Sequence, residues 1–261
     1  MIFFLFLLGL AVGSFLNVLI DRLPRDESII KGRSYCEHCK KPLIWYDLIP
    51  LLSFLILKGK CRYCHFPISW YYSVVELTTG ILFVLVYLFF PQEGIMNHEL
   101  GIMGIVSVIY YLFIVSSFIV VFFADLKYGI IPDKVVFSSI VVSIVYLFIL
   151  HNSYFIIHLL SALGAFLFFF LLYLITRGQG MGFGDVKLVF LLGLFLGWPK
   201  VIVAFYIAFL TGAILGCILI LWGKKKFSGG TVPFGPFLVL GAITSLFWGE
   251  HILIKIMQAI L

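Results

Sequence analysis

The stretch that decides the fold is residues 102–133, IMGIVSVIYYLFIVSSFIVVFFADLKYGIIPD, in which the first part, 102–124, carries no charged residue. As an α-helix, a run of this length crosses the roughly 30 Å hydrocarbon core of a bilayer, because each residue adds about 1.5 Å. Asp125 follows directly, and Gly129 and Pro132 then end the helix and open a loop. The pattern predicts a membrane-spanning helix with an acid at its boundary.

The rest of the chain has the same apolar character. Of its 261 residues, 63% are hydrophobic and 11% are charged, whereas about 25% of an ordinary soluble domain is charged. The composition excludes such a domain and predicts an all-α polytopic membrane protein with about eight transmembrane helices, because a helix satisfies its own backbone in lipid. The spans are expected at about 2–20, 72–90, 102–124, 135–150, 155–175, 186–198, 200–222 and 234–254.

These spans suggest three segments. Residues 1–20 form a first transmembrane helix, 21–71 a small cytoplasmic insertion, and 72–261 a transmembrane bundle. With 21–71 in the cytoplasm, all Lys and Arg residues except Lys200 and Lys255 fall on that side, as the positive-inside rule requires. The net charge of +6 then reflects topology and anionic lipid headgroups. It gives no reason to expect nucleic acid as a partner.

Four cysteines of the insertion form two pairs with CxxC spacing, Cys36-Glu-His-Cys39 and Cys61-Arg-Tyr-Cys64. Two short turns of this kind can bring four thiolates onto one tetrahedral Zn²⁺. The reducing cytoplasm disfavours disulfides, and a segment this small gains stability from a structural metal. The spacing therefore predicts a structural zinc site, with unmetallated or redox-active thiols as the alternative.

An apolar segment, residues 43–57, lies between the two cysteine pairs. It is too short to span a bilayer and contains Asp47 and Pro50. Two interpretations stay open. The segment either rests at the membrane interface against the bundle or forms the core of the insertion itself.

A second acid, Asp185, begins another apolar run in RGQGMGFGDVKLVFLLG, residues 177–193. An acid within lipid costs roughly 2.5–3.5 kcal/mol, so membrane acids usually serve a function or have partners. Gly182 and Gly184 permit unusual backbone angles and the close approach of an extended peptide. Taken singly, each acid is more often a helix cap, and a glycine-rich stretch more often marks helix packing.

Together, Asp125 and Asp185 point to a carboxylate pair at the membrane boundary. Two carboxylates within a few ångströms share one proton. The ionised member can then deprotonate a water while the neutral member protonates a scissile carbonyl. This is the chemistry of an aspartyl protease.

Several further motifs occur in a fixed order along nearly the whole chain. They are GSFLNVLIDRLP at 13–24, both CxxC pairs, DLIPLLSFLILKGKCRYCHFPIS at 47–69, VVELTTG at 74–80, DLKYGIIPD at 125–133, GMGFGDVKL at 180–188 and PFGPFLVLGA at 233–242. In these motifs the chain resembles the bacterial type IV prepilin peptidases, which are leader peptidase/N-methyltransferases of the GxGD aspartyl protease class.

The resemblance implies a multi-pass enzyme of the bacterial inner membrane that acts on type IV prepilin-like or pseudopilin precursors. At the cytoplasmic face it would remove their leader, typically after a Gly and before a Phe-like residue. It would then methylate the new N-terminal amine with S-adenosylmethionine. The family's motifs map the catalytic dyad onto Asp125 and Asp185, loop support onto Gly182, Gly184 and Lys187, and the zinc ligands onto Cys36, Cys39, Cys61 and Cys64.

The chain departs from the family pattern in the part associated with methyl transfer. Asp47-Leu-Ile-Pro50 stands where the family commonly reads D-N-I-P, Tyr71–Glu76 where it reads R-Y-P-L-V-E, and Asp21 where an aromatic residue is usual. Glu76 is the candidate contributor to methyl transfer, with an ordinary boundary Glu as the alternative.

Three alternative functions follow. One is a protease without methyl transfer. Another is a cation- or proton-coupled transporter with a zinc-binding loop, which would need acidic or polar residues deeper within several spans. The third is a non-catalytic assembly factor that holds pilins, which has no need of two acids at one membrane level.

Overall fold

The computed structural model describes residues 1–29, 32–89, 102–150, 152–222 and 233–260. Within these ranges the chain is helical, apart from loops and two isolated β-bridges in the insertion. Eight of the described helices are long: α1 (Ile2–Arg22), α3 (Trp70–Phe89), α5 (Ile102–Tyr128), α6 (Asp133–Leu150), α7 (Asn152–Ile175), α8 (Phe183–Leu196), α9 (Lys200–Leu221) and α10 (Gly235–Ile260).

These helices confirm the prediction of an all-α membrane protein, because each predicted span overlaps one of them. Seven are long and apolar enough to cross a membrane, and the eighth, α8, has 14 residues. The division into three segments stays a prediction. Four basic residues behind the predicted orientation, Lys31 and Lys224–Lys226, lie outside the described ranges.

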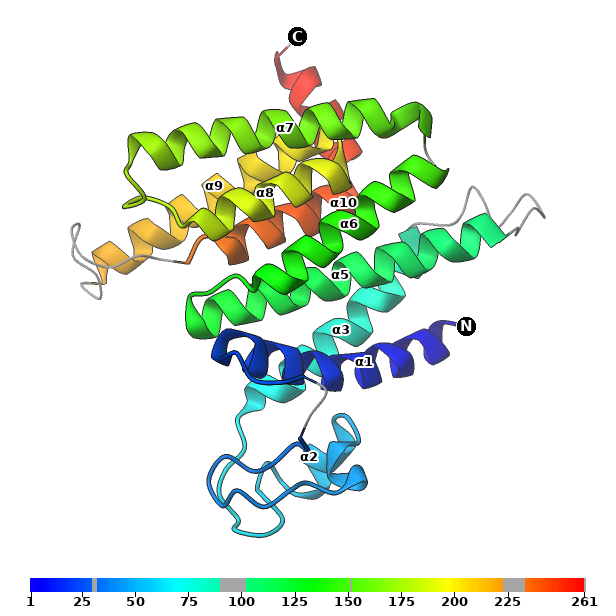
Figure 1. Cartoon of the computed structure of the whole chain (residues 1–261), viewed down its shortest axis with the longest axis vertical. Helices are drawn as coiled ribbons and strands as arrows, with labels where there is room; N and C mark the ends of the chain where they lie inside the picture. Colours follow the sequence, from blue (N-terminus) through cyan, green and yellow to red (C-terminus); the bar gives the residue numbers. More distant parts are fainter. Residues whose placement is uncertain (30–31, 90–101, 151, 223–232, 261) are drawn as a thin grey trace. The chain divides into compact units, whose positions relative to one another are not determined.

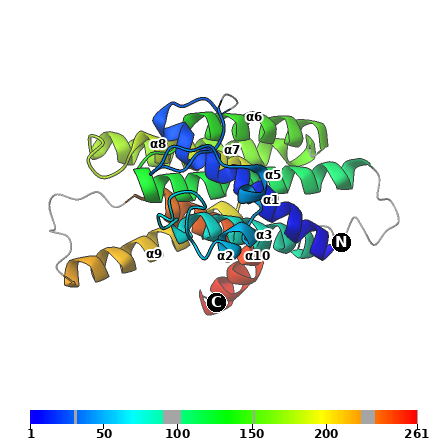
Figure 2. The same cartoon turned by 90° about the horizontal axis from the view of Figure 1, so that it is seen from below.

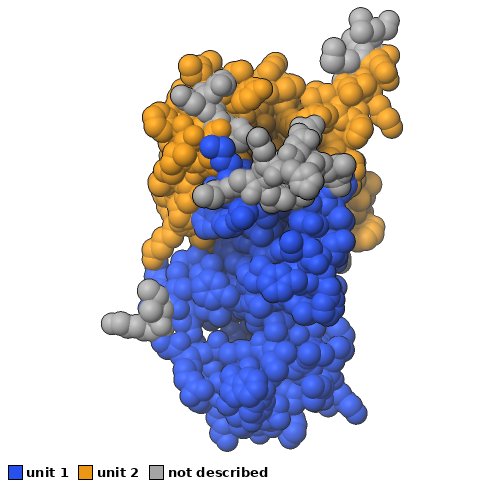
Figure 3. Space-filling model, turned by 90° about the vertical axis from the view of Figure 1, so that its right-hand side faces the viewer, with its two compact units in different colours: residues 1–123 blue, residues 124–261 orange. Residues whose placement is uncertain are grey.

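The chain forms two compact units, residues 1–123 and 124–261 (Figure 3). In the first unit α1 and α3 lie side by side, as both views show (Figure 1 and Figure 2). A Cβ added at Gly9 would lie 2.7 Å from the Gly80 Cα, and one added at Gly13 would lie 2.7 Å from the Glu76 Cα. Small residues therefore let the two backbones touch, as at many membrane helix contacts.

The insertion between α1 and α3 contains three short helices: η1 (Leu23–Arg25), η2 (Trp45–Leu48) and α2 (Leu52–Ile56). Arg22, buried at the end of α1, donates to the carbonyl oxygens of Ser28 at 2.8 Å and Arg33 at 3.2 Å. Arg62 pairs with Asp47 at 2.7 Å and lies over the Tyr46 ring. These polar contacts stabilise the fold of the insertion, which has little apolar core of its own.

The second unit is built around α8. This helix contacts α6, α7, α9 and α10, and 10 of its 14 residues are buried. A helix that is apolar on all sides packs inside a larger protein. The neighbours of α8 explain why it can be shorter than a membrane span: its side chains meet protein where a lone helix would meet lipid.

Candidate functional site

Asp125 lies in the last turn of α5, where the helix is brought to a sharp end. The Gly129 N–H donates to the Asp125 carbonyl oxygen at 2.9 Å, and Gly129 has φ +66°, a left-handed conformation that glycine adopts readily. The Asp125 side chain is buried, and its Oδ2 has no hydrogen-bond partner among the described residues. Such an oxygen is available to accept a proton or a donor from a bound molecule.

Asp185 is the third residue of α8 and is also buried. Its Oδ2 accepts the Gly182 N–H at 3.1 Å, and its own N–H donates to the Gly182 carbonyl oxygen at 3.1 Å. This is an N-terminal cap, and the positive end of the helix favours a carboxylate there. In this capping role Oδ2 accepts the hydrogen bond, and Oδ1 takes no part in the cap.

The two acids act on each other within the second unit. Asp185 lies outside the seven candidate spans. Burial, with the negative charge of Asp125 as the second cause, raises the pKa of the Asp185 carboxyl to about 7. Near neutral pH about half of the Asp185 carboxyls are therefore protonated, and a protonated member beside an ionised one is the condition in which a carboxylate pair serves as acid and base.

Ile131, in the loop after α5, packs between two glycines. A Cβ on Gly184 would lie 3.2 Å from the Ile131 Cβ, and a Cβ on Gly235 would lie 3.2 Å from the Ile131 Cδ1. The same Cβ on Gly235 would lie 2.6 Å from the Asp125 Oδ2. The end of α5, the loop 129–132 and the starts of α8 and α10 therefore meet at the acids.

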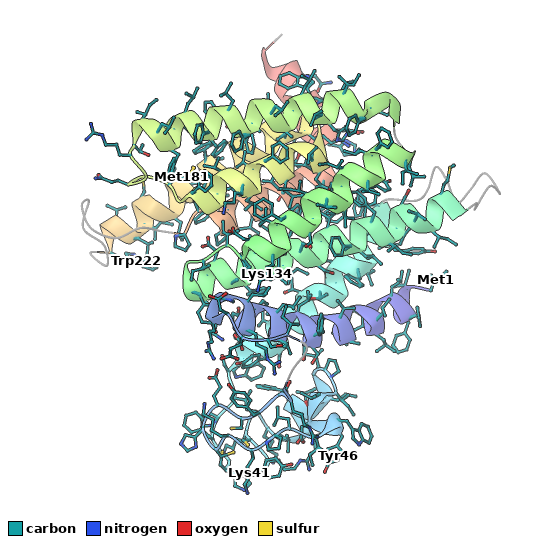
Figure 4. The ribbon with its side chains drawn as sticks, viewed as in Figure 1. Met1, Lys41, Tyr46, Lys134, Met181 and Trp222 are labelled. Atoms are coloured by element: carbon teal, nitrogen blue, oxygen red, sulfur yellow. The ribbon has the colours of Figure 1, made fainter. Side chains whose placement is uncertain are left out.

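An ion pair joins the start of α6 to α8, the helix that carries Asp185. Lys187 Nζ lies 2.7 and 2.8 Å from the two carboxylate oxygens of Asp133, the first residue of α6. The Lys187 ammonium also lies over the rings of Phe137 and Phe183, at 5.7 and 5.1 Å from their centroids. Figure 4 labels Lys134 and Met181, which neighbour Asp133 and Gly182 in the sequence. Lys187 thus ties the starts of α6 and α8 together.

The four predicted zinc ligands come together in the first unit. The Sγ atoms of Cys36, Cys39, Cys61 and Cys64 all lie within 4.8 Å of one another, and those of Cys36 and Cys64 are 3.9 Å apart. A tetrahedral zinc with bonds of about 2.3 Å places its sulfurs about 3.8 Å apart, so the arrangement fits the metal.

The two cysteine turns share one backbone pattern. The Lys40 N–H donates to the Cys36 carbonyl oxygen, and the His65 N–H donates to that of Cys61; Lys40 and His65 have φ of +57° and +56°. At Cys61, burial raises the thiol pKa, but the backbone donors of Cys64 and Tyr63, with Cys36 and Cys64 beside it, outweigh burial and lower the pKa to about 7. A thiolate is the form that binds metal.

Glu76 is buried at the start of α3, where its Oε2 accepts the Leu51 N–H at 2.9 Å. The carboxylate therefore holds the insertion to α3 through a backbone group. The structure places Glu76 in the same unit as the zinc ligands.

The two glycines before Asp185 were expected to permit unusual backbone angles, but they have ordinary ones. Gly182 has an extended φ of −75°, and neither Gly182 nor Gly184 is among the glycines with positive φ. Because Gly184 has no side chain, the Ile131 side chain can pack close to its backbone. Sequence reasoning missed Gly235, Ile131 and Asp133 as residues near the site. The Phe-Gly-Pro run at 234–236, just before an apolar stretch, was the available signal for Gly235.

Two family models match the chain. The model of the bacterial peptidase A24 N-terminal domain matches residues 7–90, and that of the type IV leader peptidase family matches residues 112–217. Several curated relatives carry the name prepilin leader peptidase/N-methyltransferase. The comparison with solved structures gave no match.

Three of these relatives illustrate the similarity. A Legionella pneumophila protein is 31% identical over 95% of this chain and 91% of its own length. A Bacillus subtilis protein is 32% identical over 97% and 96%. A Myxococcus xanthus protein is 37% identical over 84% of this chain, and the match spans 63% of that relative's length.

Proposed function

Because the chain belongs to the type IV leader peptidase family, we propose that it cleaves the leader from prepilin-like precursors and then N-methylates the new terminus. The observation that carries the proposal is the pair of buried acids, Asp125 and Asp185, which lie where the end of α5 and the loop after it meet the starts of α8 and α10. Seven apolar helices and the family together indicate a multi-pass protein of the inner membrane. We propose that the site faces the cytoplasm, as the basic residues predict.

In the cleavage step, Asp185 holds the shared proton and Asp125 is ionised. The Asp125 Oδ2, which lacks a donor among the described residues, takes a proton from a water whose oxygen attacks the scissile carbonyl carbon. Asp185 donates its proton to the carbonyl oxygen. When the tetrahedral intermediate collapses, the C–N bond breaks and the amine leaves with the proton held by Asp125, while one hydroxyl of the intermediate returns a proton to Asp185 as the carbonyl re-forms. Neither a metal nor a covalent intermediate is needed.

The substrate in this proposal is an extended leader joined to an apolar helix in the bilayer. The leader lies along the start of α8, where Gly182 and Gly184 carry no side chain. The pilin helix stays in lipid beside the enzyme, so the bilayer is a second partner. Lys187 and Gly184 support the loop, and the Gly182 N–H holds the Oδ2 of Asp185.

Methyl transfer uses S-adenosylmethionine as a co-substrate, which supplies the methyl group from its sulfonium. The new N-terminal amine must be neutral to attack that carbon; as the N–C bond forms, the C–S bond breaks and the donor leaves as a neutral thioether. The secondary ammonium that results then releases one proton to give the methylated amine. We propose that the zinc held by the four cysteines keeps the insertion folded, and that Glu76 contributes to this step. Support comes from the fit of the sulfur cluster to zinc and from the buried Glu76 carboxylate in the same unit.

The test is co-expression of a pilin-like precursor with wild type, Asp125→Asn or Asp185→Asn, followed by mass spectrometry of the substrate N-terminus. We expect leader loss only with wild type, and a further increase by the mass of one CH₂ group. Retention of full processing by either variant would disprove the dyad.

The same spectra separate the alternatives. Cleavage without the added CH₂ would identify a protease that lacks methyl transfer. A well-folded wild type that cleaves none of several precursors would favour a cation- or proton-coupled transporter.

A further inference from the structure

We propose that residues 48–56 form a re-entrant element that dips into the lipid beside α1 and α3 and is held there by the side chains of Ser14 and Glu76. All of these residues belong to the first unit. The proposed occupant of the outward face is the acyl-chain region of the leaflet next to the insertion. This inference does not depend on either proposed activity.

Two hydrogen bonds set the depth of the element. The Leu51 N–H donates to the Glu76 Oε2 at 2.9 Å, and the Ser14 Oγ donates to the Leu48 carbonyl oxygen at 3.4 Å. Ser14 precedes the end of α1 at Arg22, and Glu76 follows the start of α3 at Trp70. At about 1.5 Å per residue these positions lie about 12 Å and about 9 Å inside the helix ends. Because α1 and α3 are both candidate spans, placing their ends at the headgroup level puts the element at the depth of hydrocarbon.

Backbone groups at that depth need partners from the protein, since lipid offers none. Leu51 has φ +57° and ψ −46°, so its N–H stands outside a regular helix. The Glu76 carboxylate accepts that N–H, and the Ser14 hydroxyl serves the Leu48 carbonyl. These two side chains thus supply hydrogen-bond partners for backbone groups that lipid would leave unpaired.

Residues 48–56 must pack against the outside of the α1–α3 pair, because the two helices leave no space between them. A Cβ on Gly13 would lie 2.7 Å from the Glu76 Cα, so the helices touch along their seam. One face of the element is therefore turned toward protein and the other away from it.

The side chains of α2 fall into one that is buried against protein and three that are exposed. Phe54 is buried and packs edge-on against Trp70, with ring centroids 4.7 Å apart. Leu52, Leu55 and Ile56 are 57%, 64% and 75% exposed. Three large aliphatic side chains on one short helix are costly in water and favourable in lipid.

The flanking residues fit a membrane interface. Trp45 and Trp70 are largely exposed on either side of the element, and tryptophan is enriched at the headgroup level. Lys58 and Lys60 follow α2 directly and can reach anionic headgroups by extending their side chains. Of the two interpretations left open for residues 43–57, this favours the membrane interface.

The experiment is photo-crosslinking of the full-length protein in phospholipid nanodiscs. Benzoylphenylalanine is placed singly at Leu55, at Ile56 and, as a matched control, at Glu37, an exposed residue of the first cysteine turn. We expect phospholipid adducts at Leu55 and Ile56 at several times the yield at Glu37. Yields at both α2 positions no higher than at Glu37 would overturn the proposal.

A second comparison tests the tether. With the photoprobe at Ile56, Glu76→Gln keeps an acceptor oxygen for the Leu51 N–H, whereas Glu76→Ala removes it. We expect Glu76→Gln to retain the lipid adduct and Glu76→Ala to lose most of it, with bound zinc unchanged in both as the check on folding. An undiminished adduct in Glu76→Ala would contradict the role given to Glu76.

Discussion

At the scale of single residues, the Asp125 carboxylate has room in its position because Gly235 has no Cβ atom. A Cβ there would lie 2.6 Å from the Asp125 Oδ2, so the carboxylate would have to move. We expect Gly235→Ala to lower the rate of leader cleavage by about 100-fold, because a misplacement near 1 Å has an effect of that order. Single-turnover cleavage of a prepilin precursor measures it.

The control for this prediction is Gly164→Ala in α7. A Cβ there meets nothing within 4 Å, and alanine is the better helix former by about 1 kcal/mol. The variant should cleave at a rate within about twofold of wild type, since the site is untouched. Equal losses in the two variants would show that Gly235 has no special place beside Asp125.

The proton on Asp185 gives a prediction for the pH dependence of cleavage. Burial and the charge of Asp125 raise the pKa of Asp185 to about 7, so the acid form is present below that pH and is lost above it. We expect the single-turnover rate to fall about tenfold for each pH unit above about 7. A rate that stays level up to about pH 9, with helix content unchanged, would contradict Asp185 as the proton donor.

At the scale of helices, the starts of α6 and α8 are joined by the Asp133–Lys187 ion pair. We expect Asp133→Asn and Lys187→Met each to lower kcat for cleavage by about tenfold, because the pair positions the start of α8, which carries Asp185. The double variant should be no slower than either single one, the pattern expected when both changes remove one interaction. Stability should change by less than about 1 kcal/mol, since the pair is partly exposed.

Lys187→Arg is the matched control for the ion pair. It keeps a cation within reach of Asp133 and should restore most of the rate. If the two single variants instead combined multiplicatively, Lys187 and Asp133 would have to act separately.

Helix positions were accessible from the sequence, whereas contacts between helices were not. Apolar runs predicted α1, α3 and α9 nearly to their ends, because lipid forces such runs into helices. The same runs do not tell which helix lies inside the others, so the central place of α8 came only from the structure. The meeting of Ile131 with Gly184 and Gly235 is a tertiary contact between residues far apart in the chain, and no local pattern encodes it.

At the scale of the whole molecule, the acids and the sulfur cluster belong to different compact units. Asp125, Asp185 and the side chains packed on them lie in residues 124–261, whereas the four cysteines and Glu76 lie in residues 1–123. The described residues named at each site thus come from one unit. The two activities should therefore respond differently when one unit is damaged.

Loss of the metal is the perturbation that tests this separation. Cys61→Ser removes a buried ligand, and we expect loss of bound zinc and easier proteolysis within residues 32–69, because a small segment of this kind depends on its metal to fold. Methylation of the processed pilin should fall by at least about tenfold while cleavage stays within about threefold. Cys217→Ser, an exposed cysteine in α9 outside the cluster, should change neither. Equal loss of cleavage and methylation in Cys61→Ser would mean that the protease site needs the folded insertion, and the independence of the two sites would be wrong.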